Sequence, residues 1–433
     1  MHIFLIWSML YLILDRSASR NNVFIYQIHC LHTEMESQSK DDEDPIQQTE
    51  LPIDLISEMI LTRLPIKSVF RFKSVSKLWY STLSSSRFAF THHKFSNPSS
   101  TTQSLLIRKS NKFQIMSHEN GQIDLVKVEV DFDLGDENMV LVGTCNGLVG
   151  LGSTSGSLFI VWNPITGEFC KYLDPEISDF TTGGCMVTWG FGYVSAVDDY
   201  KFVRLCKKVF MESIRVHVYS TRFDKMKRID NDTSDNFFGL KIAERLHRPG
   251  VLVNETVYWM GGVPPMLDGL PRKILSFDLA SEIFDIFPHL EVSTPSSTCD
   301  TDKDECFDEL LCVANGCLSK YGRRVTSGED VITVLKSPGE KEEIVLSKNL
   351  ADWMYDNLIG SAGGDKIFTQ YYGDSALRLG VFDLTSQPLK HTLLMILDRG
   401  PKIEIVSYCA SLISLNAYAI ETPETHKDEV SNI

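Results

Sequence analysis

The spacing of apolar residues changes along the chain and divides it into segments of different kinds. Residues 36–50 are polar and acidic and offer almost nothing to bury, which is typical of a disordered leader. From about 51 to 94 the apolar residues recur at helical spacing. After a Ser/Thr/Pro-rich stretch at 96–103, short β-type runs separated by turn residues continue to about 420. The pattern therefore predicts a leader, a helical block, a linker and a β domain.

The helical block divides into short amphipathic helices. The first has one apolar face made of four residues: Leu55, Ile56, Met59 and Ile60. Leu64-Pro65 ends that run, and a second short helix is expected over 66–73. The third helix is predicted to place five residues on one face: Val75, Leu78, Trp79, Thr82 and Leu83. A block of roughly 40 residues cannot bury all these faces alone, so we expect either the following domain or a partner to cover the remainder.

The β region repeats at a period of 50 to 60 residues. Trp162, Tyr219 and Phe277 occupy equivalent positions, 57 and 58 residues apart, and Phe382 lies a further 105 residues on. A degenerate unit at 331–346 fills that last gap. Further hairpins are expected at 251–260 and 311–318, with turns at Asn254-Glu255 and Asn315-Gly316. A repeat of about 50 residues with about four strands is typical of a propeller blade, and the alternative is a β-sandwich or irregular sheet.

Basic and aromatic residues alternate in the stretch 66–83. No Asp or Glu lies between Glu58 and Lys94, although the chain carries a formal net charge of -15 and has a pI near 5.2. The stretch is compatible with a nucleic-acid surface, a buried core or a protein-docking face. Because Trp79 falls on the apolar side of its helix, it is not placed as a stacking platform for bases. A positive rim around an apolar face favours docking to an acidic protein partner, and we expect no nucleic acid.

The amino terminus carries a separate signal. Residues 2–14 are apolar except for His2 and Ser8, a run too short to span a bilayer, which needs about 20 residues. The run fits the apolar region of a signal peptide, and Ser17-Ala18-Ser19 fits a cleavage site. No Lys or Arg precedes it, however. Two N-glycosylation sequons, at Asn231 and Asn254, are compatible with secretion but common by chance.

The residues that carry chemistry do not form a catalytic or metal-binding pattern. The ten cysteines are irregularly spaced and include no CxxC pair, so we expect free, mostly buried thiols. Gly150-Leu151-Gly152 precedes a predicted strand rather than a helix and is interpreted as a hairpin. His92-His93 lacks a nearby third ligand, and the acidic run 301–309 lacks the spacing of a calcium loop. We expect no enzyme activity, no catalytic residue, no cofactor and no metal.

Residues 51–96 closely resemble an F-box. The residues that match are Leu51, Pro52, Asp54, Leu55, Ile60, Leu61, Leu64, Pro65, Arg71, Phe72, Lys73, Val75, Ser76, Lys77, Trp79, Phe88 and His92. The resemblance implies binding to the acidic adaptor Skp1, which connects a cargo-binding domain to a cullin–RING ubiquitin ligase. Trp79 is expected to be internal. The Skp1 contacts of the family map onto eight residues: Leu51, Pro52, Leu55, Ile56, Ile60, Leu64, Pro65 and Val69.

The following region resembles the plant F-box-associated domain. The matching segments are CNGLVGL (145–151), VWNPITGEF (161–169), GFGYVSAVDDYKFVRL (190–205), HVYS (217–220), VNETVYWMGG (253–262) and ILSFDLASEIF (274–284). The resemblance weakens beyond about 290. It implies an α plus all-β fold, in which a short three-helix F-box precedes a β-propeller-like (kelch-like) domain.

These resemblances imply the substrate-recognition subunit of an SCF-type E3 ubiquitin ligase, which holds an unidentified target protein and transfers no ubiquitin itself. The alternatives are a ligase-independent propeller-like adaptor, a glycan-binding protein, and an F-box protein of the self-incompatibility type. The expected location is the cytoplasm or nucleus, with no membrane association. The expected organisation is a leader at 1–50, an F-box at 51–96, a linker at 97–103, a β domain at 104–420 and a flexible tail at 421–433. Residues 1–34 conflict with this location, and Met35 is a typical start, so we interpret 1–34 as an over-extended gene prediction or a minor isoform.

Overall fold

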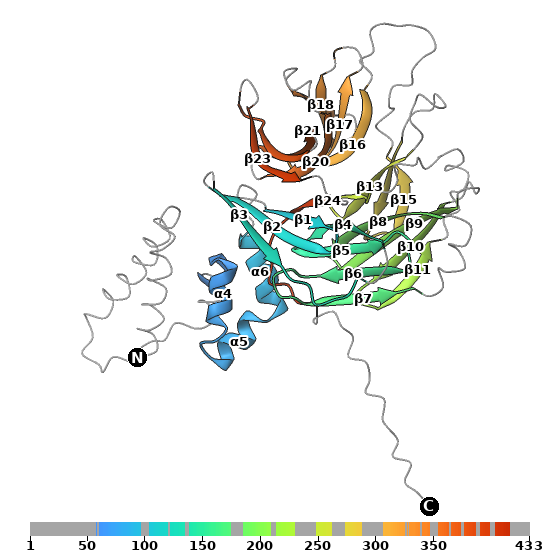
Figure 1. The fold of residues 1–433 in the computed structure, drawn as a ribbon. Coiled ribbons are helices and arrows are strands. Elements are labelled where there is room, and N and C mark those ends of the chain that lie inside the picture. The colour runs from blue at the N-terminus through green and yellow to red at the C-terminus, as the bar shows by residue number, and fades with distance from the viewer. Residues whose placement is uncertain are drawn as a thin grey trace, which may run out of the picture. The chain divides into compact units, whose positions relative to one another are not determined.

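The fold is described from a computed structural model of the chain (Figure 1). The structure describes residues 58, 60–96, 104–119, 122–134, 138–174, 185–208, 214–229, 248–261, 273–287, 306–324, 327, 329–337, 340–346, 354–362, 365–373, 376–386, 390–398 and 403–415. The chain divides into two compact units, residues 1–91 and 92–433, and each is described by itself. The predicted leader, linker and tail lie outside the described residues.

The first unit is helical. Its described elements are a 3-10 turn η2 (Leu61–Arg63) and the helices α4 (Ile66–Phe72), α5 (Lys77–Leu83) and α6 (Ser86–Ser96), the last of which crosses the boundary between the units. Leu64 is extended, as expected for a residue before proline, and α4 begins directly after Pro65. The side chain of Ser76 caps α5 by accepting a hydrogen bond of 3.1 Å from the Trp79 amide. The first predicted helix lies almost wholly outside the described residues, and α6 is a separate helix that the pattern did not define.

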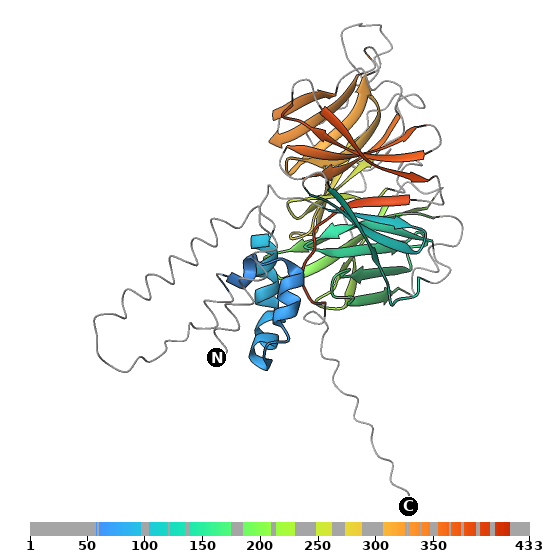
Figure 2. The same cartoon turned by 60° about the vertical axis from the view of Figure 1, so that its left-hand side comes forward.

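The second unit contains six four-stranded antiparallel sheets in the part of the chain that the structure describes (Figures 1 and 2). Five of them are consecutive in sequence: β4 (Met139–Cys145) to β7 (Phe169–Leu173), β8 (Cys185–Val194) to β11 (Lys225–Ile229), β12 (Val251–Val253) to β15 (Ile283–Ile286), β16 (Cys306–Ala314) to β19 (Glu340–Leu346), and β20 (Met354–Ser361) to β23 (Lys390–Asp398). The strands between these are β5 (Leu148–Ser153), β6 (Leu158–Trp162), β9 (Asp199–Lys208), β10 (Ile214–Ser220), β13 (Thr256–Gly261), β14 (Lys273–Asp278), β17 (Cys317–Arg324), β18 (Asp330–Ser337), β21 (Lys366–Gly373) and β22 (Ala376–Asp383). The sixth sheet joins β1 (Ser104–Lys109), β2 (Lys112–Glu119) and β3 (Gln122–Val128) to the distant β24 (Ile403–Tyr408).

The repeat predicted from the sequence corresponds to these sheets, which are the blades of a propeller. Trp162, Tyr219, Phe277 and Phe382 each lie in the third strand of a blade, namely β6, β10, β14 and β22. The degenerate unit at 331–346 is the β18–β19 hairpin. Each blade contributes its innermost strand to a ring, in which β24, β4, β8, β12, β16 and β20 follow one another and β20 contacts β24 again. The propeller prediction is therefore confirmed, and the sandwich alternative is wrong.

Two predicted turns also have the expected backbone. Asn254 and Glu255 have φ values of 48° and 62°, and Asn315 and Gly316 have 51° and 72°. Two consecutive residues with positive φ form the tight turn whose twist matches antiparallel strands. The Gly150-Leu151-Gly152 stretch lies in β5, which pairs with β6, so its interpretation as part of a hairpin is confirmed.

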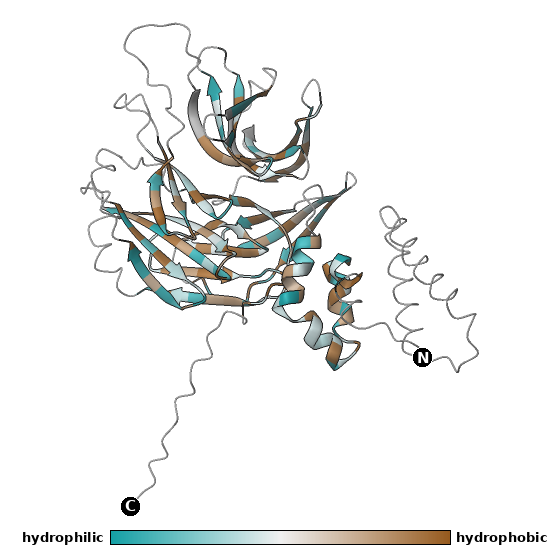
Figure 3. Ribbon diagram, turned by 180° about the vertical axis from the view of Figure 1, so that it is seen from behind, coloured by the Kyte–Doolittle hydropathy of each residue, from teal (hydrophilic) through white to brown (hydrophobic). Residues whose placement is uncertain are grey.

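Aromatic side chains fill the spaces between neighbouring blades. Trp189 on β8 is 1% exposed, and its indole nitrogen donates to the Ser153 carbonyl on the preceding blade at 2.9 Å. The two blades approach so closely that a Cβ atom at Gly152 would lie 2.6 Å from the Trp189 ring. Apolar residues recur along the strands (Figure 3); β5 and β6 are buried along their whole length, whereas β13 alternates between buried and half-buried positions.

The ring is closed by the pairing of the last strand with the first. β24 pairs antiparallel with β1 from Ser104↔Tyr408 to Lys109↔Ile403. The Arg108 guanidinium lies 2.6 Å from the Glu404 carboxylate across this pair, and it also donates to the Met139 carbonyl on β4 at 2.7 Å. Both side chains are largely buried. This ion pair therefore connects the closing strand to the next blade as well as to β1.

We number the blades along the chain, with the blade of β1 as the first, β4–β7 as the second and β8–β11 as the third. The segment after β24, residues 409–415, is held by the turns of the second blade; we name it the C-terminal strap. The Asn163 amide donates to the carbonyls of Ser411 and Ile413 at 3.2 and 2.7 Å. The Leu415 amide donates to the Glu168 carboxylate at 2.8 Å. Gly147 has φ +79° and passes so close to Ser411 that a Cβ atom would lie 2.4 Å from its hydroxyl oxygen. The strap therefore contacts two turns, CNG (145–147) and NPITGE (163–168), and both lie in segments that resemble the F-box-associated domain.

We expect Asn163→Ala to destabilise the propeller by about 3 kcal/mol, because it leaves two buried strap carbonyls and the Ile165 amide without their partner. Urea unfolding followed by tryptophan fluorescence measures the change. Gln122→Ala, at an exposed position on β3, is the matched control and should leave the unfolding free energy within about 0.5 kcal/mol of the wild type. An equally small effect of Asn163→Ala would contradict the role given to the strap.

Candidate protein-binding site

The structure describes four of the eight residues predicted to contact an adaptor. Leu64 is 2% exposed and Val69 is fully buried, whereas Ile60 is half-buried and Pro65 is exposed. The other four, Leu51, Pro52, Leu55 and Ile56, lie outside the described residues. Leu64 and Val69 thus support the core of the helical unit in this chain, and Pro65 is the member of the described set that presents its side chain to solvent.

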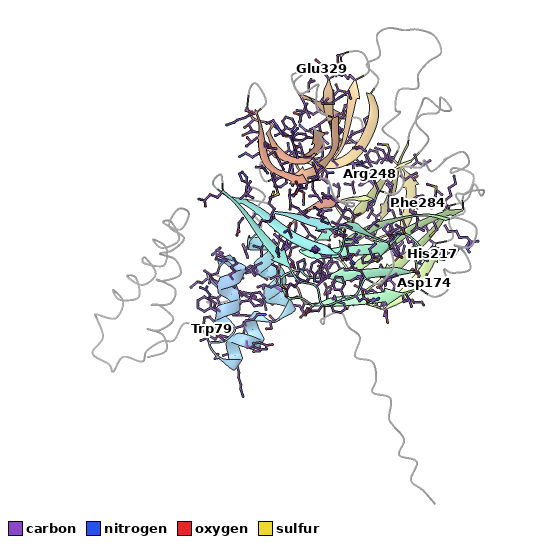
Figure 4. All side chains as sticks on the ribbon, in the orientation of Figure 1. Trp79, Asp174, His217, Arg248, Phe284 and Glu329 are labelled. Atoms are coloured by element: carbon purple, nitrogen blue, oxygen red, sulfur yellow. The ribbon has the colours of Figure 1, made fainter. Side chains whose placement is uncertain are left out.

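Trp79 is internal, as the family resemblance implied. It is 7% exposed, and its ring centroid lies 5.5 Å from that of Phe72, at an interplanar angle of 42° (labelled in Figure 4). Leu83, one turn further along α5, is also buried. The contact therefore joins α4 to α5 and defines the inward side of both short helices.

The predicted apolar stripe on α5 is wrong in part. Leu78 is 58% exposed and Val75 is 39% exposed, although both were assigned to the same buried face as Trp79. The physical reason is angular: neighbouring helical residues differ by about 100°, so Leu78 and Trp79 cannot both point inward at the centre of one face. The helix buries Trp79 and Leu83 and leaves Leu78 exposed.

Exposed apolar side chains on the two helices are candidate docking residues that sequence reasoning missed. One lies on α4 and two lie on α5. We name these three the apolar docking residues: Phe70, Leu78 and Tyr80. They are 38%, 58% and 61% exposed. Scattered exposed apolar residues are ordinary, but these come from two consecutive short helices whose other faces are used for packing. The sequence did contain a signal for the exposure of Leu78 and Tyr80: each is a direct neighbour of Trp79, so each points about 100° away from the buried tryptophan.

Exposed basic residues lie on the same two helices, and Lys73, directly after α4, contacts Phe70. Lys67, Arg71 and Lys77 are exposed, and the Lys73 ammonium lies 5.2 Å from the centroid of the Phe70 ring. Glu58 forms an ion pair with Arg87, and between Glu58 and Lys94 the sequence carries no other acid. The helical unit therefore offers apolar side chains within a field of positive charge, which suits an acidic protein surface.

The propeller has its own charged contacts between blades. Lys201 on β9 lies 2.9 Å from the Glu282 carboxylate in the β14–β15 turn, and Lys227 on β11 reaches the other oxygen at 2.9 Å. Burial alone would raise the pKa of the Glu282 carboxyl, but the hydrogen bonds from these two lysines lower it below its ordinary value. On the other side of the same blade, Arg204 lies 2.8 Å from Asp174. These pairs fix the third blade between its neighbours.

Burial changes the acidity of a thiol on strand β16 of the propeller. Burial raises the pKa of the Cys312 thiol to about 12, so this thiol stays protonated and is a poor nucleophile. Among the described residues, no group of three His, Cys, Asp or Glu side chains is placed to hold a metal ion.

Within the same residues, no helix has both the length and the apolar composition needed to cross a membrane.

Two comparisons with known proteins identify the relatives of this chain. The family described as the F-box associated beta propeller domain matches residues 89–352, and the F-box domain family matches residues 49–91. The F-box/kelch-repeat protein At3g23880 of Arabidopsis thaliana is 30% identical over 299 residues, which are 67% of this chain and 76% of that protein. F-box protein CPR1 of the same plant is 30% identical over 288 residues, which are 62% of this chain and 65% of that protein.

A solved structure titled as a nidogen/laminin complex is similar over 71% of this chain and 99% of its own, with a TM-score of 0.43 and 10% identity. That likeness is too distant to carry an argument. The family assignment rests instead on the two domain matches and on the first Arabidopsis relative.

The pH dependence of propeller stability follows from His217 on β10 (Figure 4). Burial, together with the positive charge of Arg204, lowers the pKa of His217 from 6.5 to about 4. The folded state thus keeps this imidazole neutral where the unfolded chain binds a proton, so stability should fall as the pH drops from about 6.5 toward 4. Urea midpoints at several pH values measure the slope, and His217→Gln should reduce it. A slope unchanged by that substitution would contradict the assignment, and Gln122→Ala is again the control.

The order of the two domain matches agrees with the order of the two structural units, and the blades continue beyond the end of the family match through β20–β24. The chain is therefore an F-box protein that belongs to the F-box associated beta propeller family.

Proposed function

We propose that this chain is the substrate-recognition subunit of an SCF-type E3 ubiquitin ligase, with the F-box docking the adaptor Skp1 and the propeller holding a target protein. The observation that supports it most directly is the combination of an F-box match with an exposed apolar and basic helical surface ahead of a propeller. The eight predicted contacts, Leu51, Pro52, Leu55, Ile56, Ile60, Leu64, Pro65 and Val69, remain part of the proposal.

In this proposal the chain contributes geometry rather than chemistry. A receptor that holds a target lysine near the E2-bound ubiquitin raises the effective concentration of one reactant beside the other. The transfer itself is assigned to the E2 and RING partners. The proposal places the protein in the cytoplasm or nucleus, where the ligase machinery acts, and the kelch-like character of the propeller also remains a prediction.

The apolar docking residues and the buried pair have different roles in the proposal. Leu64 and Val69 keep α4 in place, because removing a buried leucine side chain costs about 2–5 kcal/mol. Phe70, Leu78 and Tyr80 then meet the adaptor directly. Their truncation should therefore weaken binding without unfolding the helices, since exposed substitutions usually change stability by less than about 0.5 kcal/mol.

The adaptor is tested by pull-down of purified Skp1 with the full chain. Leu64→Ala combined with Pro65→Ala should abolish Skp1 capture while leaving the propeller folded, because the helical unit loses a core side chain. Leu78→Asp combined with Tyr80→Asp should reduce the affinity at least tenfold while the helical content of the chain is retained. Circular dichroism separates these two results.

Leu173→Asp is the matched control, because Leu173 is an exposed leucine on the outer strand β7 of the propeller. It should bind Skp1 as the wild type does. Undiminished capture by both F-box variants would refute the adaptor interface. Skp1 and a cullin that fail to co-purify with the wild-type chain would instead favour the ligase-independent adaptor or glycan-binding alternative.

A further inference from the structure

Positive charge is concentrated in one blade of this acidic protein. Residues 199–229, which contain β9, β10 and β11, carry nine Lys and Arg against three Asp and Glu, a net charge of +6. The whole chain has a net charge of -15. The third blade is therefore a local reversal of the overall charge, and nothing in the proposed adaptor contact uses it.

The reversal is sharpest at the outer edge of the blade. Each of the six sheets that the structure describes ends in an outer strand: β3, β7, β11, β15, β19 or β23. By Lys, Arg, Asp and Glu content, β11 has a net charge of +3, whereas the other five range from -2 for β19 to +1 for β7. An outer strand of any blade is an edge, but β11 is distinguished from its equivalents by charge.

In the part of the chain that the structure describes, β11 is the last strand of its sheet. The sheet order is β11-β10-β9-β8, and among the described residues no strand pairs with the far side of β11. Lys225 and Lys227 lie on the same face of the strand, two residues and about 7 Å apart, with Arg228 on the opposite face. All three are exposed, although Lys227 also contacts Glu282.

An apolar anchor stands at the start of this edge. Phe223, in the β10–β11 turn, is 63% exposed. The turn around it is rigidly held: the Phe223 amide donates to the Ser220 hydroxyl at 3.2 Å, and the Arg222 amide donates to the Asp199 carboxylate at 2.9 Å. Because these hydrogen bonds fix the backbone of the turn, the turn loses little further backbone freedom when a partner covers Phe223.

We propose that the outer edge of β11 binds an extended acidic segment of a partner protein as an added strand. Acidic residues at alternate positions of that segment would lie opposite Lys225 and Lys227, since directly opposed side chains on paired strands lie about 5 Å apart. An apolar residue at the adjoining end would cover Phe223. The inference rests on the proposed function only in naming that partner as a ubiquitination target.

Two other occupants fit these observations less well. Single-stranded nucleic acid needs a run of stacking side chains along a basic groove, whereas Phe223 is a single aromatic beside a flat strand edge. A second copy of the chain would offer the acidic strand β19. Lys336 and Lys341, however, lie beside Glu342 and Glu343 and would repel Lys225 and Lys227.

The test uses the full chain and a fluorescein-labelled peptide of nine residues that alternates Glu with Val, with binding followed by fluorescence anisotropy. Lys225→Glu combined with Lys227→Glu should weaken binding at least tenfold, and Phe223→Ala at least threefold. Lys341→Glu is the matched control, because Lys341 is an exposed lysine on the outer strand β19 and the substitution changes the total charge in the same direction. It should change the affinity less than twofold.

Peptide chemistry tests the strand geometry separately. The same peptide with Gln in place of Glu should bind at least tenfold more weakly, and so should a peptide with backbone N-methyl groups on every second residue, which cannot complete a ladder. N-methylation without effect would overturn the added-strand geometry.

Three further outcomes would overturn the proposal: unchanged binding by the charge-reversal variant, equally tight binding of oligouridylate at the same site, or self-association that the Lys225→Glu substitution abolishes. Skp1 capture by the same variants is measured in parallel. Because the peptide assay contains no adaptor, loss of peptide binding with normal Skp1 capture, or the reverse, separates failure of this inference from failure of the proposed function.

Discussion

The pairing of β24 with β1 is the constraint on which the propeller depends, because each blade is only four strands and buries its aromatic faces against two neighbours. Without that pairing the first blade lacks its innermost strand and β20 has no neighbour on one side. The buried Arg108–Glu404 ion pair makes the closure specific, since a charge left alone there would be costly. Asn163 and Glu168 then hold the chain beyond the closing strand. The blade that contains β6 and β7 therefore holds the strap that follows the closing strand.

The helical unit shows how one aromatic contact separates structural from interacting residues. Once Trp79 packs on Phe72, the remaining directions of α4 and α5 are determined. Leu64 and Val69 point to the core, and Phe70 and Leu78 are left at the surface. The buried residues of this motif therefore determine whether the helical unit folds. The exposed residues determine which surface of a partner the unit can contact.

The sequence predicts this protein best where a local pattern and the tertiary structure agree. The aromatic residues at Trp162, Tyr219 and Phe277 recur because each lies at or next to the end of the third strand of a blade. The closing strand could not be recognised in this way. β24 pairs with a strand about 300 residues away, and no residue pattern near β24 indicates that partner. Leu78 is exposed because the buried face of α5, which holds Trp79 and Leu83, is narrower than the predicted stripe. The charge of β11 is visible in the sequence, but only the strand order shows that it lies at an edge.

Closure by the last strand also has a consequence during synthesis. A ribosome that adds roughly 5–20 residues per second exposes β1 to β3 some 15–60 s before β24 exists. Through that interval the nascent propeller is an open arc, with the apolar faces at both ends of the arc uncovered and with Arg108 lacking its carboxylate. The ring therefore cannot close until β24 has been synthesised, and the uncovered faces are exposed to other proteins for that time.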